Sequence, residues 1–166
     1  MKKILLPLIL IAVAALVWFA ISSNKQQAPA FSLIDFNGHP VSEQQFAGKV
    51  TLVNFWATSC VGCVAEMPQL ITTQAKYGGQ GYQTIAIAME YDPEDHIKEF
   101  LTKYDMSQFT VAKDKTGAVA KAYGNVQLTP TSVLVDSHGD IVTTIVGEPN
   151  FADLHQLIES ELAKRA

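Results

Sequence analysis

VTLVNFWATSCVGCVAEMP, residues 50–68, is the stretch of sequence that decides the fold. Its opening run, Val50–Ala57, is almost continuously β-branched or aromatic, which is typical of a strand that is covered on both faces. A helix is predicted to follow at Val61–Tyr77. Cys60 and Cys63 are therefore expected to lie where a buried strand turns into a helix.

The rest of the chain alternates strand and helix patterns around this stretch. Gly78 and Gly79 are expected to end the first helix, and Pro68 to kink it. Asp92-Pro93 indicates a helix start, with Asp92 as the N-cap and proline at the first helical position. Further elements are predicted as a strand or hairpin at 31–38, a buried strand at 82–89, a strand at 109–112, a helix at 116–123, strands at 131–136 and 141–147, and a final helix capped by Asn150. This order predicts an α/β fold with a central mixed sheet flanked by helices.

Composition limits the class of protein. The chain has 166 residues, of which 48% are hydrophobic and 17% charged, so it is long enough for one compact domain and too apolar for a disordered chain. Only two cysteines occur, which excludes both a disulfide scaffold and a four-cysteine zinc site. Beyond Lys3 the chain carries 10 basic and 16 acidic residues, and this acidic balance gives no support for nucleic-acid binding.

The N-terminal segment indicates a membrane protein. Ile4–Ile21 is an uncharged apolar run of 18 residues, near the lower limit for a membrane-spanning helix. Lys2 and Lys3 precede it, which by the positive-inside rule leaves the N-terminus in the cytoplasm and the rest of the chain outside. A cleaved signal peptide is the alternative, with Ala20-Ile21-Ser22 as its cleavage site, although the apolar run is long for one. The predicted organisation is a membrane anchor at 1–24, a polar tether at 25–28 and one domain at 29–166.

The spacing of Cys60 and Cys63 carries the chemistry. Residues three apart share one face of a helix, so the two sulfurs can close a small disulfide loop. Cys60 is expected at the helix N-terminus, where free amides and the helix dipole favour a thiolate, and Cys63 one turn inward. Cys60 is therefore predicted to attack a substrate disulfide, and Cys63 to resolve the mixed disulfide that forms. Two inert core cysteines or part of a metal site are the alternatives, but the histidines are scattered, and Val64 in place of histidine excludes haem attachment.

Residues 54–68 resemble the active-site segment of the TlpA/ResA-like membrane-anchored thiol–disulfide oxidoreductases of the thioredoxin superfamily. The resemblance covers roughly residues 29–164, and four further matches support it: Phe31-Ser-Leu-Ile-Asp, Asn37-Gly38, Gly48-Lys49 and Leu128-Thr-Pro-Thr131. It implies a thioredoxin-like fold with an N-terminal β-hairpin extension and a helix–strand insertion that contains the helix at 93–104. Ser59 stands where the family usually has tryptophan, and Val61-Gly62 lacks the proline or histidine found there, which leaves the redox potential open.

The resemblance also implies the residues that bind substrate. Thr129-Pro130 matches the proline that faces the disulfide in thioredoxin-fold proteins, where its peptide bond is cis. A backbone wall at Thr129 and Pro130 would let a substrate chain pair beside Cys60. Trp56 is predicted as a further substrate contact, with a place in the core as the equal alternative.

An acid near the cysteines is needed to move protons. Asn54 stands where thioredoxins have a buried aspartate, and an amide cannot accept a proton at neutral pH. Glu90 ends the second buried strand. The resemblance implies that this position matches a glutamate of the ResA-like proteins. We expect Glu90 to be partly desolvated, with a raised pKa, and to shuttle the proton of Cys63. For Glu66, one turn beyond Cys63, a surface role is at least as compatible with the sequence.

The expected function is that of an extracytoplasmic thiol–disulfide oxidoreductase, namely a disulfide reductase acting on exported protein thiols, for example in cytochrome c maturation. The resemblance implies disulfide-containing substrate proteins, a membrane thiol-reductant carrier as electron donor, the Cys60–Cys63 pair as redox group, and no metal or other cofactor. It places the protein in the bacterial inner (cytoplasmic) membrane as a single-pass protein whose domain faces the periplasm or outside. A disulfide oxidase or isomerase, a thiol peroxidase and a non-catalytic binding module are the alternatives. Ala57 and Val53 disfavour the peroxidase, which has threonine and proline at these positions.

Overall fold

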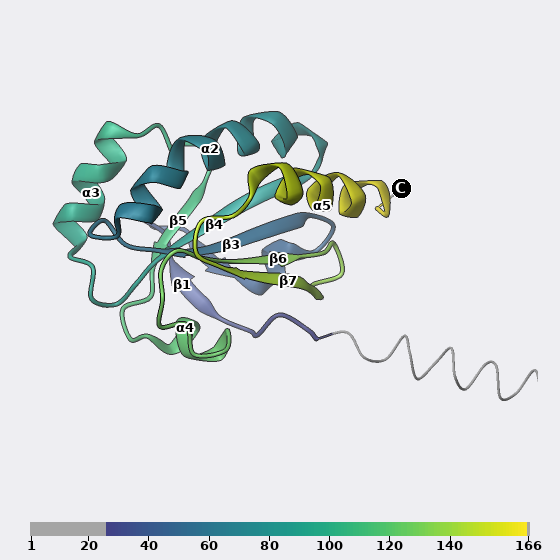
Figure 1. Ribbon diagram of the computed structural model, residues 1–166. Coiled ribbons are helices and arrows are strands. Elements are labelled where there is room, and N and C mark those ends of the chain that lie inside the picture. Colours follow the sequence, from purple (N-terminus) through teal and green to yellow (C-terminus); the bar gives the residue numbers. More distant parts are fainter. Residues whose placement is uncertain (1–25, 166) are drawn as a thin grey trace, which may run out of the picture.

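The computed structural model describes residues 26–165, which form a five-stranded sheet with helices on both faces (Figure 1). The strands of the sheet are β3 (Val50–Trp56), β4 (Tyr82–Ala88), β5 (Thr110–Lys113), β6 (Thr131–Val135) and β7 (Ile141–Val146). The helices are α2 (Val61–Tyr77), α3 (Glu94–Lys103), α4 (Ala118–Ala122) and α5 (Phe151–Ala163). A separate hairpin consists of β1 (Ser32–Ile34) and β2 (Pro40–Ser42), and two short 3-10 helices are η1 (Glu43–Phe46) and η2 (Gly78–Gln80).

The sheet is mixed, as the order of elements predicts. Its strand order is β5-β4-β3-β6-β7, with β3, β4 and β5 parallel to one another. β6 pairs antiparallel with β3, and β7 antiparallel with β6. The hairpin extension and the α3–β5 insertion expected from the resemblance are both present. β3 is therefore the central strand, and its last residues lead directly to the cysteines.

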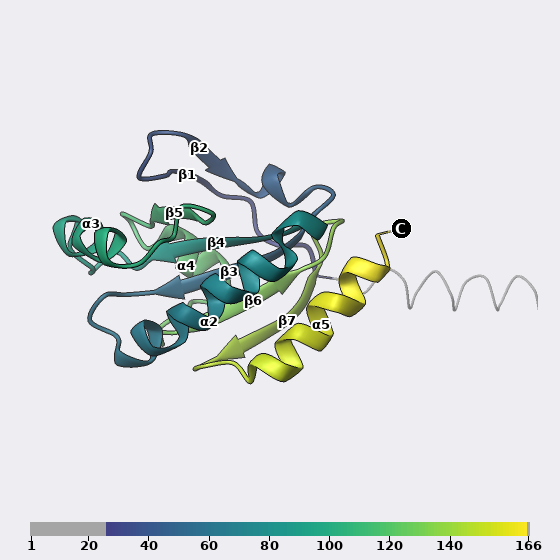
Figure 2. The same cartoon turned by 90° about the horizontal axis from the view of Figure 1, so that it is seen from above.

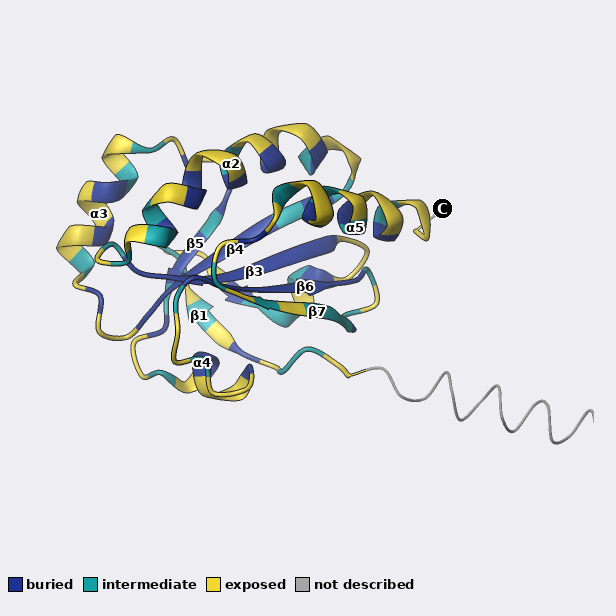
Figure 3. Cartoon of the chain, viewed as in Figure 1, coloured by how far each residue is buried: buried dark blue, intermediate teal, exposed yellow. Residues whose placement is uncertain are grey.

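Two apolar cores lie on the two faces of this sheet. Side chains alternate along β3, so that Leu52 and Trp56 face α2, α3 and α5, whereas Val53 and Phe55 face the hairpin, η1 and α4. Figure 2 shows α2 and α5 lying beside each other over the first face. Every residue of β3 is buried, as Figure 3 shows in dark blue. Burial on both faces explains the continuous apolar run of this strand.

The predicted bounds of α2, Val61–Tyr77, are confirmed. After Tyr77, Gly78 keeps right-handed helical angles and begins η2. The left-handed residue that turns the chain is Gly81, with φ of 97°. The predicted N-cap role of Asp92 is wrong, because Pro93 takes that place and the Asp92 side chain bonds to Thr58 instead. Asn150 caps α5 as predicted, its side-chain oxygen accepting bonds from two backbone amides.

The predicted membrane anchor at 1–24 lies outside the described residues. Within residues 26–165, no helix combines the length and apolar character needed to cross a bilayer. The described part of the predicted tether, residues 26–28, contacts the domain. Gln27 pairs with Asp140 in an isolated bridge, and the Ala28 amide donates to the Gly139 carbonyl at 2.8 Å.

Candidate active site

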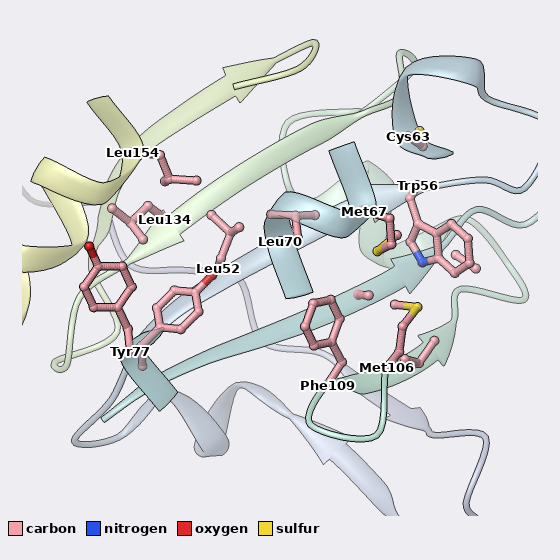
Figure 4. Packing of buried hydrophobic residues seen from close by; sticks show 14 of the residues in the cluster. Leu52, Trp56, Cys63, Met67, Leu70, Tyr77, Met106, Phe109, Leu134 and Leu154 are labelled. Carbon is pink, nitrogen blue, oxygen red and sulfur yellow. The ribbon is translucent and has the colours of Figure 1, made fainter. Parts of the chain in front are cut away.

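The two cysteines lie at the junction of β3 and α2, as predicted. They form a disulfide, with their Cα atoms 5.2 Å apart. Cys60 is the N-cap of α2, and its Sγ accepts a hydrogen bond of 3.1 Å from the Cys63 amide. Cys60 is half-buried, whereas Cys63 is fully buried in the core (Figure 4). Cys60 is thus the sulfur that a second disulfide can approach, and Cys63 is the shielded one.

A proline segment faces the disulfide loop. The Thr129–Pro130 peptide bond is cis, as predicted. Gly62, between the cysteines, lies so close to Pro130 that a Cβ on it would come within 3.4 Å of Pro130 Cδ. The Pro130 carbonyl accepts a bond of 2.8 Å from the Gly147 amide, which ties this segment to the end of β7. A methyl group at position 62 would therefore lie in van der Waals contact with the proline ring.

Glu66 is the acid that the fold buries at the site. It has no exposed surface, and it lies three residues beyond Cys63 on the face of α2 that packs against the sheet. Asn54 of β3 donates from Nδ2 to Glu66 Oε1 at 2.8 Å and to Ser132 Oγ at 3.0 Å. Burial raises the pKa of Glu66 to about 7; the Asn54 bond opposes the shift, and the nearby charge of Glu148 adds to it.

Two acceptor atoms that are unpaired among the described residues, one on Glu66 and one on Asn54, favour the protonated form of Glu66. Glu66 Oε2 and Asn54 Oδ1 are buried, and neither finds a hydrogen-bond partner within the described part of the chain. A buried charge without full pairing is costly, whereas a protonated carboxyl is neutral and carries a donor. Glu66 is therefore a proton-holding group, one helical turn from the shielded sulfur, that changes state near neutral pH.

The prediction that Glu90 is desolvated near the cysteines is wrong. β4 ends at Ala88, and the Glu90 side chain is exposed. Its carboxylate lies over Gly117 instead, so closely that a Cβ on that glycine would come within 2.5 Å of Glu90 Oε2. The Glu90 carboxylate thus lies beside the start of α4, whose N-cap is Gly117.

The prediction that Trp56 contacts substrate is also wrong. Its side chain is fully buried and packs against Phe100 of α3, with the ring centroids 4.9 Å apart. Figure 4 shows Trp56 beside Met67 in the core between the sheet and the helices. Trp56 supports the floor of the site and does not reach its surface.

Four exposed apolar side chains lie around the cysteines and the proline. Val61 follows Cys60, Leu128 precedes Pro130 by two residues, and Val146 pairs with Thr131 in the sheet. The fourth is Tyr91, whose hydroxyl lies 3.4 Å from Thr129 Oγ1. We call these four residues the apolar rim. Sequence reasoning did not identify the apolar rim, because exposure depends on loops that are remote in the chain.

Comparison with known proteins agrees with this geometry. Residues 23–158 match the Redoxin family. The chain is 34% identical over 134 residues to the thiol-disulfide oxidoreductase ResA of Bacillus thuringiensis subsp. konkukian, covering 81% of this chain and 76% of that protein. A candidate thioredoxin of Neisseria meningitidis, solved in solution, is 43% identical with a TM-score of 0.76, covering 83% of this chain and 91% of that one.

A thiol:disulfide interchange protein of the thioredoxin family from Chlorobium tepidum TLS has the same fold. Its TM-score is 0.76 at 26% identity, over 84% of this chain and 98% of that chain. Fold, cysteine geometry and relatives therefore agree with the resemblance noted from residues 54–68. The chain belongs to the Redoxin family, and it is a thiol–disulfide oxidoreductase with a thioredoxin-like fold.

Proposed function

We propose that this protein is a disulfide reductase that acts on exported protein thiols, including those of apocytochrome c. The observation that carries this proposal is the pairing of a half-buried Cys60 with a shielded Cys63 and a buried acid, Glu66. Strong disulfide oxidants stabilise their reduced thiolate form. Here Val61-Gly62 brings no charge to Cys60, and the buried Glu66 brings no cation that would stabilise a thiolate, so the disulfide form is the more stable partner.

The reaction follows from the two sulfurs. In the reduced protein the Cys60 thiolate attacks one sulfur of the substrate disulfide, forming a mixed disulfide and releasing the other substrate sulfur as a thiolate. Cys63 then gives its proton to the Glu66 carboxylate and attacks Cys60 Sγ. The second substrate thiolate leaves, and Cys60 and Cys63 are joined. The substrate has gained two electrons and the enzyme has lost two, which a membrane thiol-reductant carrier would return.

A peptide with an oxidised Cys-x-x-Cys-His sequence tests the substrate and the direction together, since this is the haem attachment motif of c-type cytochromes. Reduced protein mixed with an equal amount of the oxidised peptide is expected to leave most of the peptide reduced at equilibrium, as measured by alkylation and mass spectrometry. If the oxidised protein instead converts most of the reduced peptide to its disulfide, the protein is an oxidase.

The apolar rim predicts the side chains that the substrate presents. Leu128→Asp is expected to raise KM for a peptide with apolar residues beside its disulfide by about tenfold, equivalent to ~1.4 kcal/mol, and to leave kcat unchanged. Ile34→Asp is the matched control, because Ile34 is similarly exposed but lies on β1, in the hairpin. Equal KM values for the two variants would exclude the rim as the docking surface.

We also propose that the domain acts outside the cytoplasm, attached to the bacterial inner membrane by residues 1–24. The support is the uncharged run Ile4–Ile21 after Lys2 and Lys3. In intact cells, a thiol reagent that cannot cross the inner membrane is expected to label the reduced cysteines of the full chain. Labelling that requires lysis of the cells would place the domain in the cytoplasm.

A further inference from the structure

We propose that Asp92 is a positioning residue for the reaction: through Thr58 it fixes the loop that carries Cys60, and so sets how readily the two cysteines join. Asp92 is nearly fully buried and is not part of the chemistry described above. It belongs to the turn between β4 and α3, which is 32 residues from Cys60 in sequence.

Asp92 contacts Thr58 with both carboxylate oxygens. Oδ2 accepts the Thr58 backbone amide at 2.7 Å, and Oδ1 accepts the Thr58 hydroxyl at 2.5 Å. Hydrogen bonds to an ionisable carboxyl are among the stronger ones in proteins, and two from one residue restrict both its position and its orientation. We call this pair of bonds the Thr58–Asp92 clamp.

The turn that carries Asp92 is itself fixed to the sheet. The Met89 amide donates to the Trp56 carbonyl at 3.0 Å, which extends the pairing of β3 and β4 by one bond. The Asp92 amide then donates to the Met89 carbonyl at 3.1 Å. The clamp therefore anchors Thr58 to the end of the central strand pair.

Thr58 lies two residues before Cys60, inside the turn that starts α2. The Cys60 amide donates to the Ala57 carbonyl at 3.2 Å, so that Thr58 and Ser59 form the bend of this turn. Ser59 is exposed, and Cys60 is the N-cap of the helix. The Thr58–Asp92 clamp is thus the side-chain contact that holds the bend from which the Cys60 Sγ projects.

Fixing this bend affects the equilibrium between disulfide and dithiol. Two thiols join more readily when the protein holds them near each other, because less freedom is lost when the bond forms. Cys63 is held by its burial in α2, so the freedom that matters is that of Cys60. Releasing the bend is expected to lower the effective concentration of one thiol toward the other, which makes the disulfide easier to reduce.

The test compares variants that remove one bond or keep both. Thr58→Val removes the hydroxyl donor. Asp92→Asn replaces one of the two acceptor oxygens by an NH2 group, which cannot accept a hydrogen bond from Thr58. Each is expected to lower the equilibrium constant for forming the Cys60–Cys63 disulfide in a glutathione redox buffer by about tenfold, which corresponds to ~1.4 kcal/mol. The equilibrium constant of the double variant is expected to be little lower than that of Asp92→Asn alone, because both substitutions act on the same contact between Thr58 and Asp92.

Two controls separate positioning from general destabilisation. Thr58→Ser keeps both donors and is expected to restore the constant to within about twofold of the unchanged protein. Asp105→Asn alters an exposed aspartate whose carboxylate accepts the Ser107 amide, away from the cysteines, and is expected to leave the constant unchanged. If Asp92→Asn does not fold, Thr58→Val decides. Unchanged constants in the variants that fold, or equal losses in Thr58→Ser and Thr58→Val, would overturn the proposal.

Discussion

Glu66→Gln is expected to make the oxidised protein more stable at pH 8, by at most about 3 kcal/mol. The folded protein holds the Glu66 proton up to a pKa of about 7, whereas the unfolded chain releases it at the ordinary value of 4.5. The raised pKa means that folding takes up a proton, so the stabilisation is fully present below pH 4.5 and is lost as pH rises through 7. Glutamine is neutral at every pH and can still accept the Asn54 bond.

Urea unfolding at pH 4, 6 and 8 checks this prediction. The unchanged protein is expected to lose stability between pH 4 and pH 8 relative to Glu66→Gln, with most of the difference arising between pH 4.5 and 7. A variant that is less stable than the unchanged protein at pH 8 would mean that Glu66 is held as a paired carboxylate, contrary to its burial and its orphaned Oε2.

The same variant is expected to slow the second step of the reaction. Without a carboxylate to take the Cys63 proton, resolution of a preformed mixed disulfide at pH 7.5 is expected to fall by a factor on the order of 100. Stopped-flow release of the substrate thiol measures this step. Glu90→Gln is the matched comparison, and because Glu90 is exposed beside Gly117 it is expected to resolve at the unchanged rate. A gain in stability together with a loss of rate would mark Glu66 as a residue kept for function.

Substituting either cysteine is expected to have the largest effect on turnover. Cys60→Ser removes the attacking sulfur, and Cys63→Ser removes the one that releases the product, so each is expected to lower steady-state reduction of a disulfide substrate by a factor on the order of 1000 or more. The two losses have different causes. Cys60→Ser does not react with substrate, whereas Cys63→Ser reacts once and stays joined to it.

The fold was predictable because its signals are local or periodic. The continuous apolar run of β3 indicated a strand buried on both faces, and all seven of its residues are buried. The N-cap of α5 at Asn150 depends only on neighbouring residues, and it was placed correctly. The predicted N-cap role of Asp92 is wrong because its side chain bonds to Thr58, which is remote in sequence and cannot be found from a local cap pattern.

The site was only partly predictable. The cysteine roles follow from spacing, but the prediction for Glu90 rests on the end of its strand, and the direction of a side chain beyond a strand end depends on the loop that follows. Glu66 carried a usable signal. The buried face of α2 shows helical spacing and includes Cys63, Glu66, Met67 and Leu70. This spacing places Glu66 on the buried face rather than on the surface.

Mapping the trapped mixed disulfide tests the central claim, that Cys60 attacks and Cys63 resolves. Reduced Cys63→Ser protein is mixed with a disulfide-containing peptide, quenched by alkylation, digested and analysed by mass spectrometry. The account predicts one stable adduct, joined through Cys60, and none in the Cys60→Ser protein under the same conditions. Absence of the Cys60 adduct, or equally rapid trapping through Cys63 in the Cys60→Ser protein, would contradict it.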